Sequence, residues 1–123
     1  MEFKDNEAIY LQIAGYLGEH ILVGKWAEEQ KIPSVRELAV TLEVNPNTVM
    51  RAYEFMQNQE VIYNKRGLGF FVSPQGADKV RAFRKARFME EELPVLFRNM
   101  TLVGIGMDEV RAEFEKYISK NNS

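Results

Sequence analysis

The chain has 123 residues, a formal net charge of −2 and 46% hydrophobic residues, which is enough for one folded core and little more. It contains no cysteine, so it forms neither a disulfide framework nor a thiolate metal site, as expected in the reducing cytoplasm. No apolar run approaches the roughly 18 residues of a membrane span, and the acidic N-terminus does not resemble a secretory signal.

The charges are distributed unevenly along the chain. Residues 1–30 contain two basic and six acidic side chains, residues 31–87 contain ten and five, and residues 88–123 contain four and seven. The middle segment is therefore positive between two negative ends, although the chain as a whole is acidic. A positive field concentrated in one segment favours binding of nucleic acid there, with an affinity that falls as salt rises.

Residues 7–23 have the spacing of a first amphipathic helix, and Gly24 ends it. Trp26 is expected to fill the core rather than to contact a ligand. His20 is the only histidine, and it has no second histidine or cysteine to form a metal or catalytic site with. The residues predicted to face the core from this helix are Ile9, Ile13, Tyr16 or Leu17, and Ile21.

Residues 34–58 are predicted to form two short helices joined by a tight turn. Ser34 and Glu37 make a capping box that starts the first helix. Asn45 is a favourable N-cap for the second helix, with Pro46 at its first position. The residues predicted to be buried are Val35, Leu38, Ala39 and Leu42 in the first helix and Val49, Ala52, Tyr53 and Met56 in the second.

The outer side of the second helix carries side chains suited to DNA. An amide such as Asn47 and a guanidinium such as Arg51 can pair with base edges. A hydroxyl such as Thr48 and the N–H groups of the helix N-terminus can hold a phosphate. The outward-facing residues are Asn47, Met50, Arg51, Glu54 and Asn58, with Thr48 on the shoulder.

Residues 61–63 and 70–72 are short β-prone runs, and residues 64–69 between them are predicted to form a hairpin loop. Lys65 and Arg66 at its tip would neutralise phosphates, and Arg66 could enter a minor groove. A basic hairpin tip alone is usually only a solvated turn. Helix, turn, helix and basic wing in this order within about forty residues predict a winged helix-turn-helix.

These elements resemble the DNA-binding domain of the GntR family of bacterial transcription regulators. The family pattern is roughly Pro-Ser-x-Arg-x-Leu-Ala, Val-x-x-x-Thr-Val and a Gly-x-Gly-x-Phe-Val wing, and residues 33–39, 44–49 and 67–72 match it in register. Arg51 matches a position that is often basic, and we add Lys65 as the second cation of the wing tip. The resemblance implies DNA contacts by Arg36 from the first helix, by Asn45, Asn47 and Thr48 from the second, and by Arg66 and Gly67 from the wing.

Three residues depart from the family pattern. Met50 stands where many members carry a polar or basic residue, so we assign it no base contact. Glu43 and Glu60 occupy positions often held by glycine. A non-glycine residue with a left-handed backbone costs roughly 1 kcal/mol, which the fold should tolerate.

From Pro74 onward the composition changes. Residues 74–76 are interpreted as a linker between a winged helix-turn-helix domain of residues 1–73 and a helical tail of residues 77–123. The tail is predicted to form one long helix bent near Pro94, a turn at residues 104–106 and a final helix. Its apolar residues are Val80, Phe83, Phe88, Val95, Leu96 and Phe97 in the long helix and Val110, Phe114, Tyr117 and Ile118 in the last.

The two tail helices cannot bury their apolar faces against each other alone, so we expect an isologous homodimer. The alternative is that they fold back onto the DNA-binding domain. The predicted fold class is α+β, mostly helical. The short tail resembles the YtrA-like branch of the family, in which the tail serves dimerisation and the genes often neighbour those of ATP-binding-cassette transporters.

The resemblance implies a dimeric repressor that binds an inverted-repeat operator in double-stranded DNA. It implies no cofactor and no metal, and it leaves open whether a small-molecule effector exists. Two other classes of function agree less well with the sequence. A protein-docking module would expose more apolar residues around Asn47, Thr48 and Arg51. An enzyme is disfavoured by the isolated histidine and by the lack of a cysteine, a phosphate loop or facing carboxylates.

Overall fold

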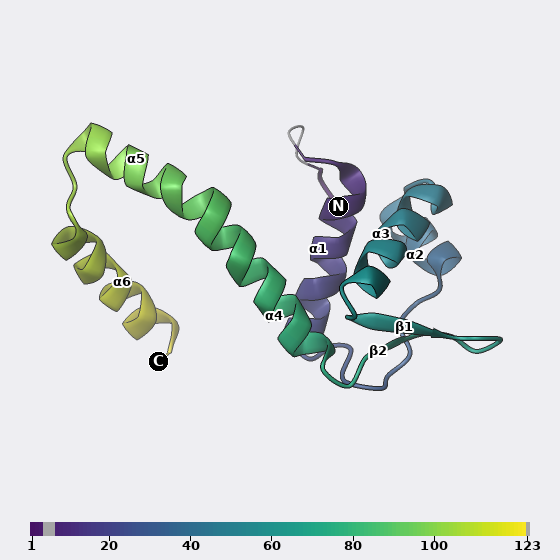
Figure 1. Ribbon diagram of the computed structural model, residues 1–123. Coiled ribbons are helices and arrows are strands. Elements are labelled where there is room, and N and C mark those ends of the chain that lie inside the picture. The colour runs from purple at the N-terminus through teal and green to yellow at the C-terminus, as the bar shows by residue number, and fades with distance from the viewer. Residues whose placement is uncertain (4–6, 123) are drawn as a thin grey trace. The chain divides into compact units, whose positions relative to one another are not determined.

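The computed structural model describes residues 1–3 and 7–122 (Figure 1). Strands β1 (Ile62–Lys65) and β2 (Gly69–Val72) form one antiparallel hairpin among helices. The fold is therefore α+β and mostly helical, as predicted. Two compact units are present, Met1–Arg84 and Lys85–Ser123. The helices are α1 (Ile9–Leu22), α2 (Val35–Leu42), α3 (Pro46–Asn58), α4 (Gly76–Arg87), α5 (Leu93–Val103) and α6 (Met107–Asn121), with a π-helical segment η1 (Phe88–Glu92) before α5.

The first unit has one hydrophobic core, to which α1, α2, α3 and the hairpin all contribute. The apolar faces predicted for α2 and α3 are confirmed, with Val35 half-buried at the start of α2 and the others buried. On α1 the prediction was wrong for Ile9, which is the first residue of the helix and is 44% exposed. The buried residues of α1 and α3 that face each other across this core include Ile13, Leu17, Ile21, Val49, Ala52, Tyr53 and Met56.

Local hydrogen bonds fix where α2 and α3 begin. The Ser34 Oγ accepts a hydrogen bond from the Glu37 backbone N–H at 3.1 Å, and the Glu37 carboxylate accepts one from the Ser34 N–H at 2.9 Å. Asn45 Oδ1 accepts a hydrogen bond from the Asn47 N–H at 2.8 Å, and Pro46 is the first residue of α3. Both caps predicted from the sequence are therefore confirmed.

Three glutamates have left-handed backbones in the first unit. Glu43 ends α2 with φ 56°, and Glu60 has φ 61° before β1, at the two positions where the sequence departs from glycine. Glu29, with φ 65°, is a third that the sequence did not signal. Each costs roughly 1–2 kcal/mol of backbone strain that the surrounding contacts must offset.

Trp26 and the single histidine have structural roles. Trp26 is half-buried and packs against the core, and its ring stacks on that of His20 with 4.9 Å between centroids. His20 Nδ1 lies 2.9 Å from the Tyr16 carbonyl oxygen, one helical turn earlier. These contacts hold the loop that follows α1 against the helix.

Helix α4 begins inside the first unit, which differs from the predicted linker at residues 74–76 and domain end at residue 73. Gly76 is the first residue of α4 and is buried. Val80 is fully buried in the core, and the Phe83 ring packs edge-to-face on Phe55 with centroids 5.9 Å apart. Val80 and Phe83 were predicted to belong to the tail. The helical spacing of apolar residues shows that one face of a helix is buried, but it does not show which part of the protein packs against that face.

Two glycines allow α4 to approach the rest of this unit closely. A Cβ atom added to Gly76 would lie 2.7 Å from Val72 Cγ1 and 2.8 Å from the Val61 carbonyl oxygen. A Cβ atom added to Gly18 on α1 would lie 3.0 Å from Val80 Cγ1. The start of α4 is thus packed at backbone distance against both the hairpin and α1.

The second unit contains η1, α5 and α6. The helix that was predicted to bend near Pro94 contains the π-helical segment η1, which ends just before α5, and the proline lies in the first turn of α5. Proline has no N–H to donate to the preceding turn, and a π-helical turn accommodates that loss. Gly104, with φ 77°, ends α5, and α6 follows after Gly106.

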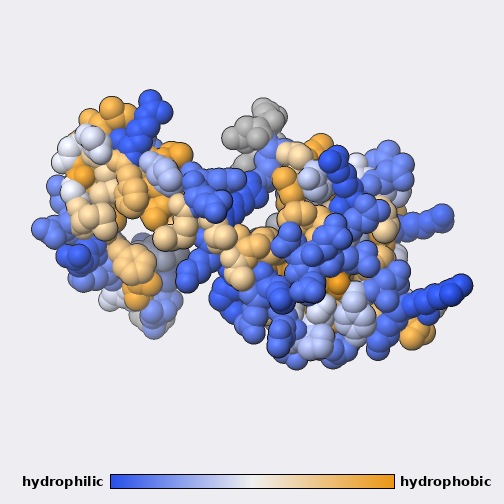
Figure 2. All heavy atoms as spheres, in the orientation of Figure 1, coloured by the Kyte–Doolittle hydropathy of each residue, from blue (hydrophilic) through white to orange (hydrophobic). Residues whose placement is uncertain are grey.

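Apolar side chains of this unit are largely exposed. Met100 is the one buried residue among those described here, whereas Phe97 is 46%, Phe114 59% and Tyr117 63% exposed. In Figure 2 hydrophobic residues gather over α5 and α6. We call this surface the tail apolar face; it consists of Phe88, Val95, Leu96, Phe97, Phe114, Tyr117 and Ile118.

Candidate nucleic-acid interface

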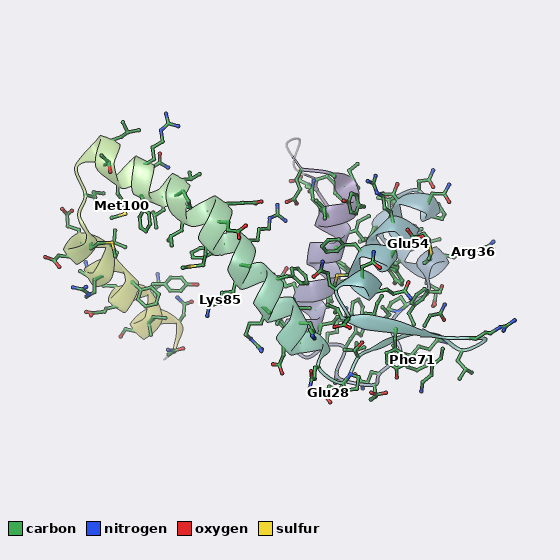
Figure 3. All side chains as sticks on the ribbon, in the orientation of Figure 1. Glu28, Arg36, Glu54, Phe71, Lys85 and Met100 are labelled. Atoms are coloured by element: carbon green, nitrogen blue, oxygen red, sulfur yellow. The ribbon has the colours of Figure 1, made fainter. Side chains whose placement is uncertain are left out.

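Helix α3 presents one polar face to solvent because its other face is completely buried. Asn47, Arg51 and Glu54 are exposed, and Thr48 is half-buried beside them. The Glu54 side chain can be followed in Figure 3. Since the buried stripe is locked in the core, α3 cannot rotate about its axis. The polar side chains of its first two turns therefore occupy fixed positions, as direct base readout requires.

A buried tyrosine ties α3 to the start of α2. Tyr53 is fully buried, and its hydroxyl donates a hydrogen bond to the Pro33 carbonyl oxygen at 2.6 Å. Burial raises the pKa of Tyr53, so the hydroxyl stays protonated and remains a donor. This bond holds the two helices of the motif in a single relative orientation.

Asn45 and Asn47 play different parts at the start of α3. The Oδ1 of Asn45 accepts a hydrogen bond from the N–H of Asn47, and the amide NH₂ of the same side chain takes no part in this cap. The Asn47 side chain is exposed. Asn45 is consequently a helix cap, whereas the side chain of Asn47 stays exposed to solvent.

Arg51 lies over an aromatic ring from another helix. Its guanidinium carbon is 4.0 Å from the centroid of the Tyr10 ring on α1, which is the distance of a cation–π contact. An open hollow of about 400 Å³ lies here between the first turns of α1 and α3. It is lined by Ala8, Ile9, Tyr10, Asn47, Thr48 and Arg51.

The hairpin separates its two predicted cations. Lys65 is the last residue of β1, and its ammonium lies 4.7 Å from the Phe71 ring centroid and 5.8 Å from that of Tyr63. It therefore lies along the strand face instead of projecting from the tip. Arg66 is exposed in the turn, and Gly67 follows with φ 81°, a conformation that glycine adopts without strain. The hairpin tip extends away from the helices in Figure 1.

Arg36 completes the basic set from the first turn of α2, where its side chain points outward from the helix (Figure 3). Some other cations are paired with carboxylates, such as Lys79 with Glu60 at 3.2 Å and Arg111 with Asp108 at 3.2 Å. Within residues 1–3 and 7–122, Arg36 and Arg66 enter no such pair. Their charges are available to an external polyanion.

The sequence and the geometry together match one known family. The model of the bacterial regulatory proteins of the gntR family matches residues 9–72, which span the three helices and the wing. The chain belongs to the GntR family. Over 116 residues it is 32% identical to the HTH-type transcriptional repressor YtrA of Bacillus subtilis, covering 94% of this chain and 88% of that protein.

Solved structures place this GntR regulator among winged-helix proteins. A putative GntR-family regulator from Bacteroides thetaiotaomicron is 46% identical, with a TM-score of 0.78 and coverage of 93% of this chain and 99% of the other. The DNA-binding domain of AraR, solved in complex with an operator, is 27% identical, with a TM-score of 0.54, over 59% of this chain and 88% of that one. Because the YtrA match includes the tail, the protein is a YtrA-like transcriptional regulator and not an enzyme.

The predicted site residues fall into three groups in this GntR regulator. Asn47, Thr48 and Arg51 share the first turns of α3, with Asn45 as its cap. Arg66 and Gly67 form the wing turn with Lys65 on its flank. Arg36 stands on α2. Tyr10 was not predicted as a site residue. Its position at the start of α1 does not indicate that its ring will contact the guanidinium of Arg51, which is distant in the sequence.

The described part of the chain contains neither a metal-binding cluster nor a membrane-spanning helix. No cluster of three or more histidine, cysteine, aspartate or glutamate side chains there could hold a metal ion. Likewise, the helices formed by those residues include none with the length and apolarity needed to cross a membrane.

Proposed function

We propose that this GntR regulator binds an inverted-repeat operator as a homodimer and represses transcription from the adjacent promoter. One observation carries the proposal: the winged-helix unit exposes unpaired arginines on α2 and the wing beside the polar first turns of a rigidly held α3. The YtrA relative is named a repressor, which supports the sign of regulation. Repression would follow when the bound dimer blocks the polymerase in the cytoplasm, where the chromosome lies.

The residues divide into reading and positioning contacts. Asn47 and Arg51 reach base edges in the major groove from α3, and Thr48 contacts a phosphate there. Arg36 approaches the DNA from α2. On the wing, Arg66 enters the adjacent minor groove, where the narrow width of A-tracts favours an arginine.

Smaller contributions come from three other positions. Lys65 neutralises a phosphate from the flank of the wing, and Asn45 adds its free amide at the start of α3. Gly67 lets the backbone of the turn come close to the DNA because it has no side chain. The YtrA-like tail further suggests a transporter operon as the regulated unit.

The tail apolar face supports the homodimer. Contiguous exposed patches of this kind on small proteins mark interaction sites, since their hydration is unfavourable. In a two-fold dimer the same face would be buried on both subunits. Two recognition helices would then read half-sites one DNA turn apart, about 34–36 Å, or a multiple of that distance.

The first experiment is fluorescence anisotropy with the duplex upstream of the protein's own gene and a scrambled duplex of the same composition. Titrations at about 50 and 200 mM salt separate phosphate binding from base readout. We expect tight, salt-sensitive binding to the native duplex and weak binding to the scrambled one. Equal weak binding to both at either salt concentration would contradict an autoregulatory operator and favour a docking module.

Light scattering on full-length variants tests the dimer. Phe97→Glu and Phe114→Glu each place a charge on the tail apolar face and should give the monomer mass, whereas wild type gives the dimer mass. Val40→Glu is the matched control, because Val40 is 78% exposed on α2 in the other unit. A wild-type monomer, or dimers of both tail variants, would contradict this interface.

A further inference from the structure

The segment that precedes α2 is hydrogen-bonded to β2 and forms an isolated antiparallel bridge with it between Lys31 and Phe71. The Glu29 N–H donates to the Val72 carbonyl oxygen at 2.8 Å, the Val72 N–H donates to the Gln30 carbonyl at 3.0 Å, and the Ile32 N–H donates to the Phe70 carbonyl at 2.9 Å. These bonds make residues 29–32 an antiparallel neighbour of β2. The segment is thereby fixed to the wing and not free to move independently of it.

Lys31 lies on the outer face of the wing hairpin. It pairs with Phe71 across the strands, and Phe71 pairs with Tyr63 on β1. Side chains alternate along a strand, and the next residue, Ile32, is 2% exposed and points into the core. The side chain of Lys31 is therefore on the solvent side, on the face that also carries Lys65 above Phe71.

The second glycine of the wing makes room for this lysine. A Cβ atom at Gly69 would lie 2.9 Å from Lys31 Cε and 3.7 Å from its Nζ. The Lys31 side chain thus crosses over the Gly69 backbone. The pKa of Glu37, the residue next to Arg36, is lowered mainly by its hydrogen bonds with Ser34, and the charge of Lys31 adds to that effect. Lys31 therefore lies against the wing and precedes the first turn of α2, which carries Arg36, by only a few residues.

The nearby carboxylates are engaged elsewhere. The Glu29 carboxylate accepts a hydrogen bond from the Tyr63 hydroxyl, which raises the pKa of Tyr63, and Glu37 accepts one from the Ser34 N–H. In the part of the chain that the structure describes, Lys31 forms no ion pair. Its ammonium is an unneutralised charge on the solvent side of the wing.

We propose that Lys31 is a further DNA-binding residue, which contacts the phosphate backbone between the strand contacted by Arg36 and the groove entered by the wing. The inference rests on the proposed DNA-binding function and adds a residue that the family pattern does not mark. A lysine on a solvated strand face is a point charge without base-reading geometry. Its contribution is therefore the same for every DNA sequence.

Three full-length variants test this role by anisotropy. Lys31→Met keeps the aliphatic chain over Gly69 and removes the charge, and Lys31→Arg keeps the charge. Lys79→Gln is the control, because that ammonium is already paired with Glu60. Each subunit of the dimer loses one phosphate contact, and each lost contact lowers the slope of log affinity against log salt by about 0.9, so the slope should fall by about 1.8. The ratio of affinities at 50 and 200 mM salt should then shrink about 12-fold in Lys31→Met.

The dependence on DNA sequence and the slopes of the control variants separate the role of Lys31 from the DNA-binding function as a whole. Lys31→Met should weaken binding to native and scrambled duplexes by the same factor, while Lys31→Arg and Lys79→Gln keep the wild-type slope. A wild-type slope in Lys31→Met would overturn the role of Lys31 and leave the proposed function intact. Wild-type protein that shows no salt-dependent DNA binding would instead refute the function itself. Melting curves of all variants establish that each is folded.

Discussion

Replacing Val80 with alanine should destabilise the protein, although Val80 lies beyond the boundary drawn from the sequence. Val80 is 0% exposed, and its Cγ1 packs so closely over Gly18 on α1 that a Cβ atom added there would lie 3.0 Å from it. The substitution removes two buried methyl groups, worth about 1.6 kcal/mol in transfer free energy at about 0.8 kcal/mol each. The cavity left behind adds to this, for a total loss of about 2–3 kcal/mol.

Urea unfolding followed by far-UV circular dichroism at a fixed protein concentration measures this loss. Val40→Ala on α2 is the matched control: the same two methyl groups are removed from a residue that is 78% exposed, so the change should stay within about 0.5 kcal/mol. If both variants lose the same small amount of stability, the start of α4 is not part of the DNA-binding core. A first unit that extends to Arg84 would then be refuted.

Four other changes have defined outcomes. Arg36→Ala should weaken operator binding by about 1–3 kcal/mol with an unchanged melting point; unchanged anisotropy titrations would remove it from the interface. Tyr53→Phe deletes the donor to the Pro33 carbonyl and should cost about 1–2 kcal/mol in urea unfolding, and a neutral result would mean that water replaces the hydroxyl. Glu43→Gly relieves a left-handed backbone and should raise the melting temperature by about 4 °C; a decrease would show that side-chain contacts outweigh the strain. The pKa of Glu37 is lowered from 4.5, so its stabilising effect is present above that pH and disappears as the pH falls through the folded-state pKa. Melting points between pH 2 and 6 should therefore fall less steeply for Glu37→Gln than for wild type, and parallel curves would contradict the shift.

Local features of the fold were predictable from the sequence because they depend on neighbours in the chain. The capping box at Ser34, the cap at Asn45 and the buried stripe of α3 each need only a few consecutive residues. The interruption before Pro94 is local for the same reason. The wing turn also followed from its glycines, although β1 extends two residues further than the β-prone run indicated.

Contacts between distant segments were not predictable. Val80 looks the same in a helical stripe whether a second subunit or Gly18 covers it. The pairing of Arg51 with Tyr10 joins α3 to α1 over forty positions of sequence, and the single bridge at Lys31 is too short to show a β pattern. Of the candidate site, the residues carried by the family pattern were available from the sequence, whereas the residues that position or supplement them required the fold.

The stacking of Trp26 on His20 gives this protein a built-in optical probe. It is the chain's single tryptophan, and it lies in the Met1–Arg84 unit. Its emission therefore reports the unfolding of that unit alone, while circular dichroism sums the helices of both units. Superimposable denaturation curves from the two signals would mean that the units melt as one cooperative block. Separated curves would resolve the stability of each unit from one unlabelled sample.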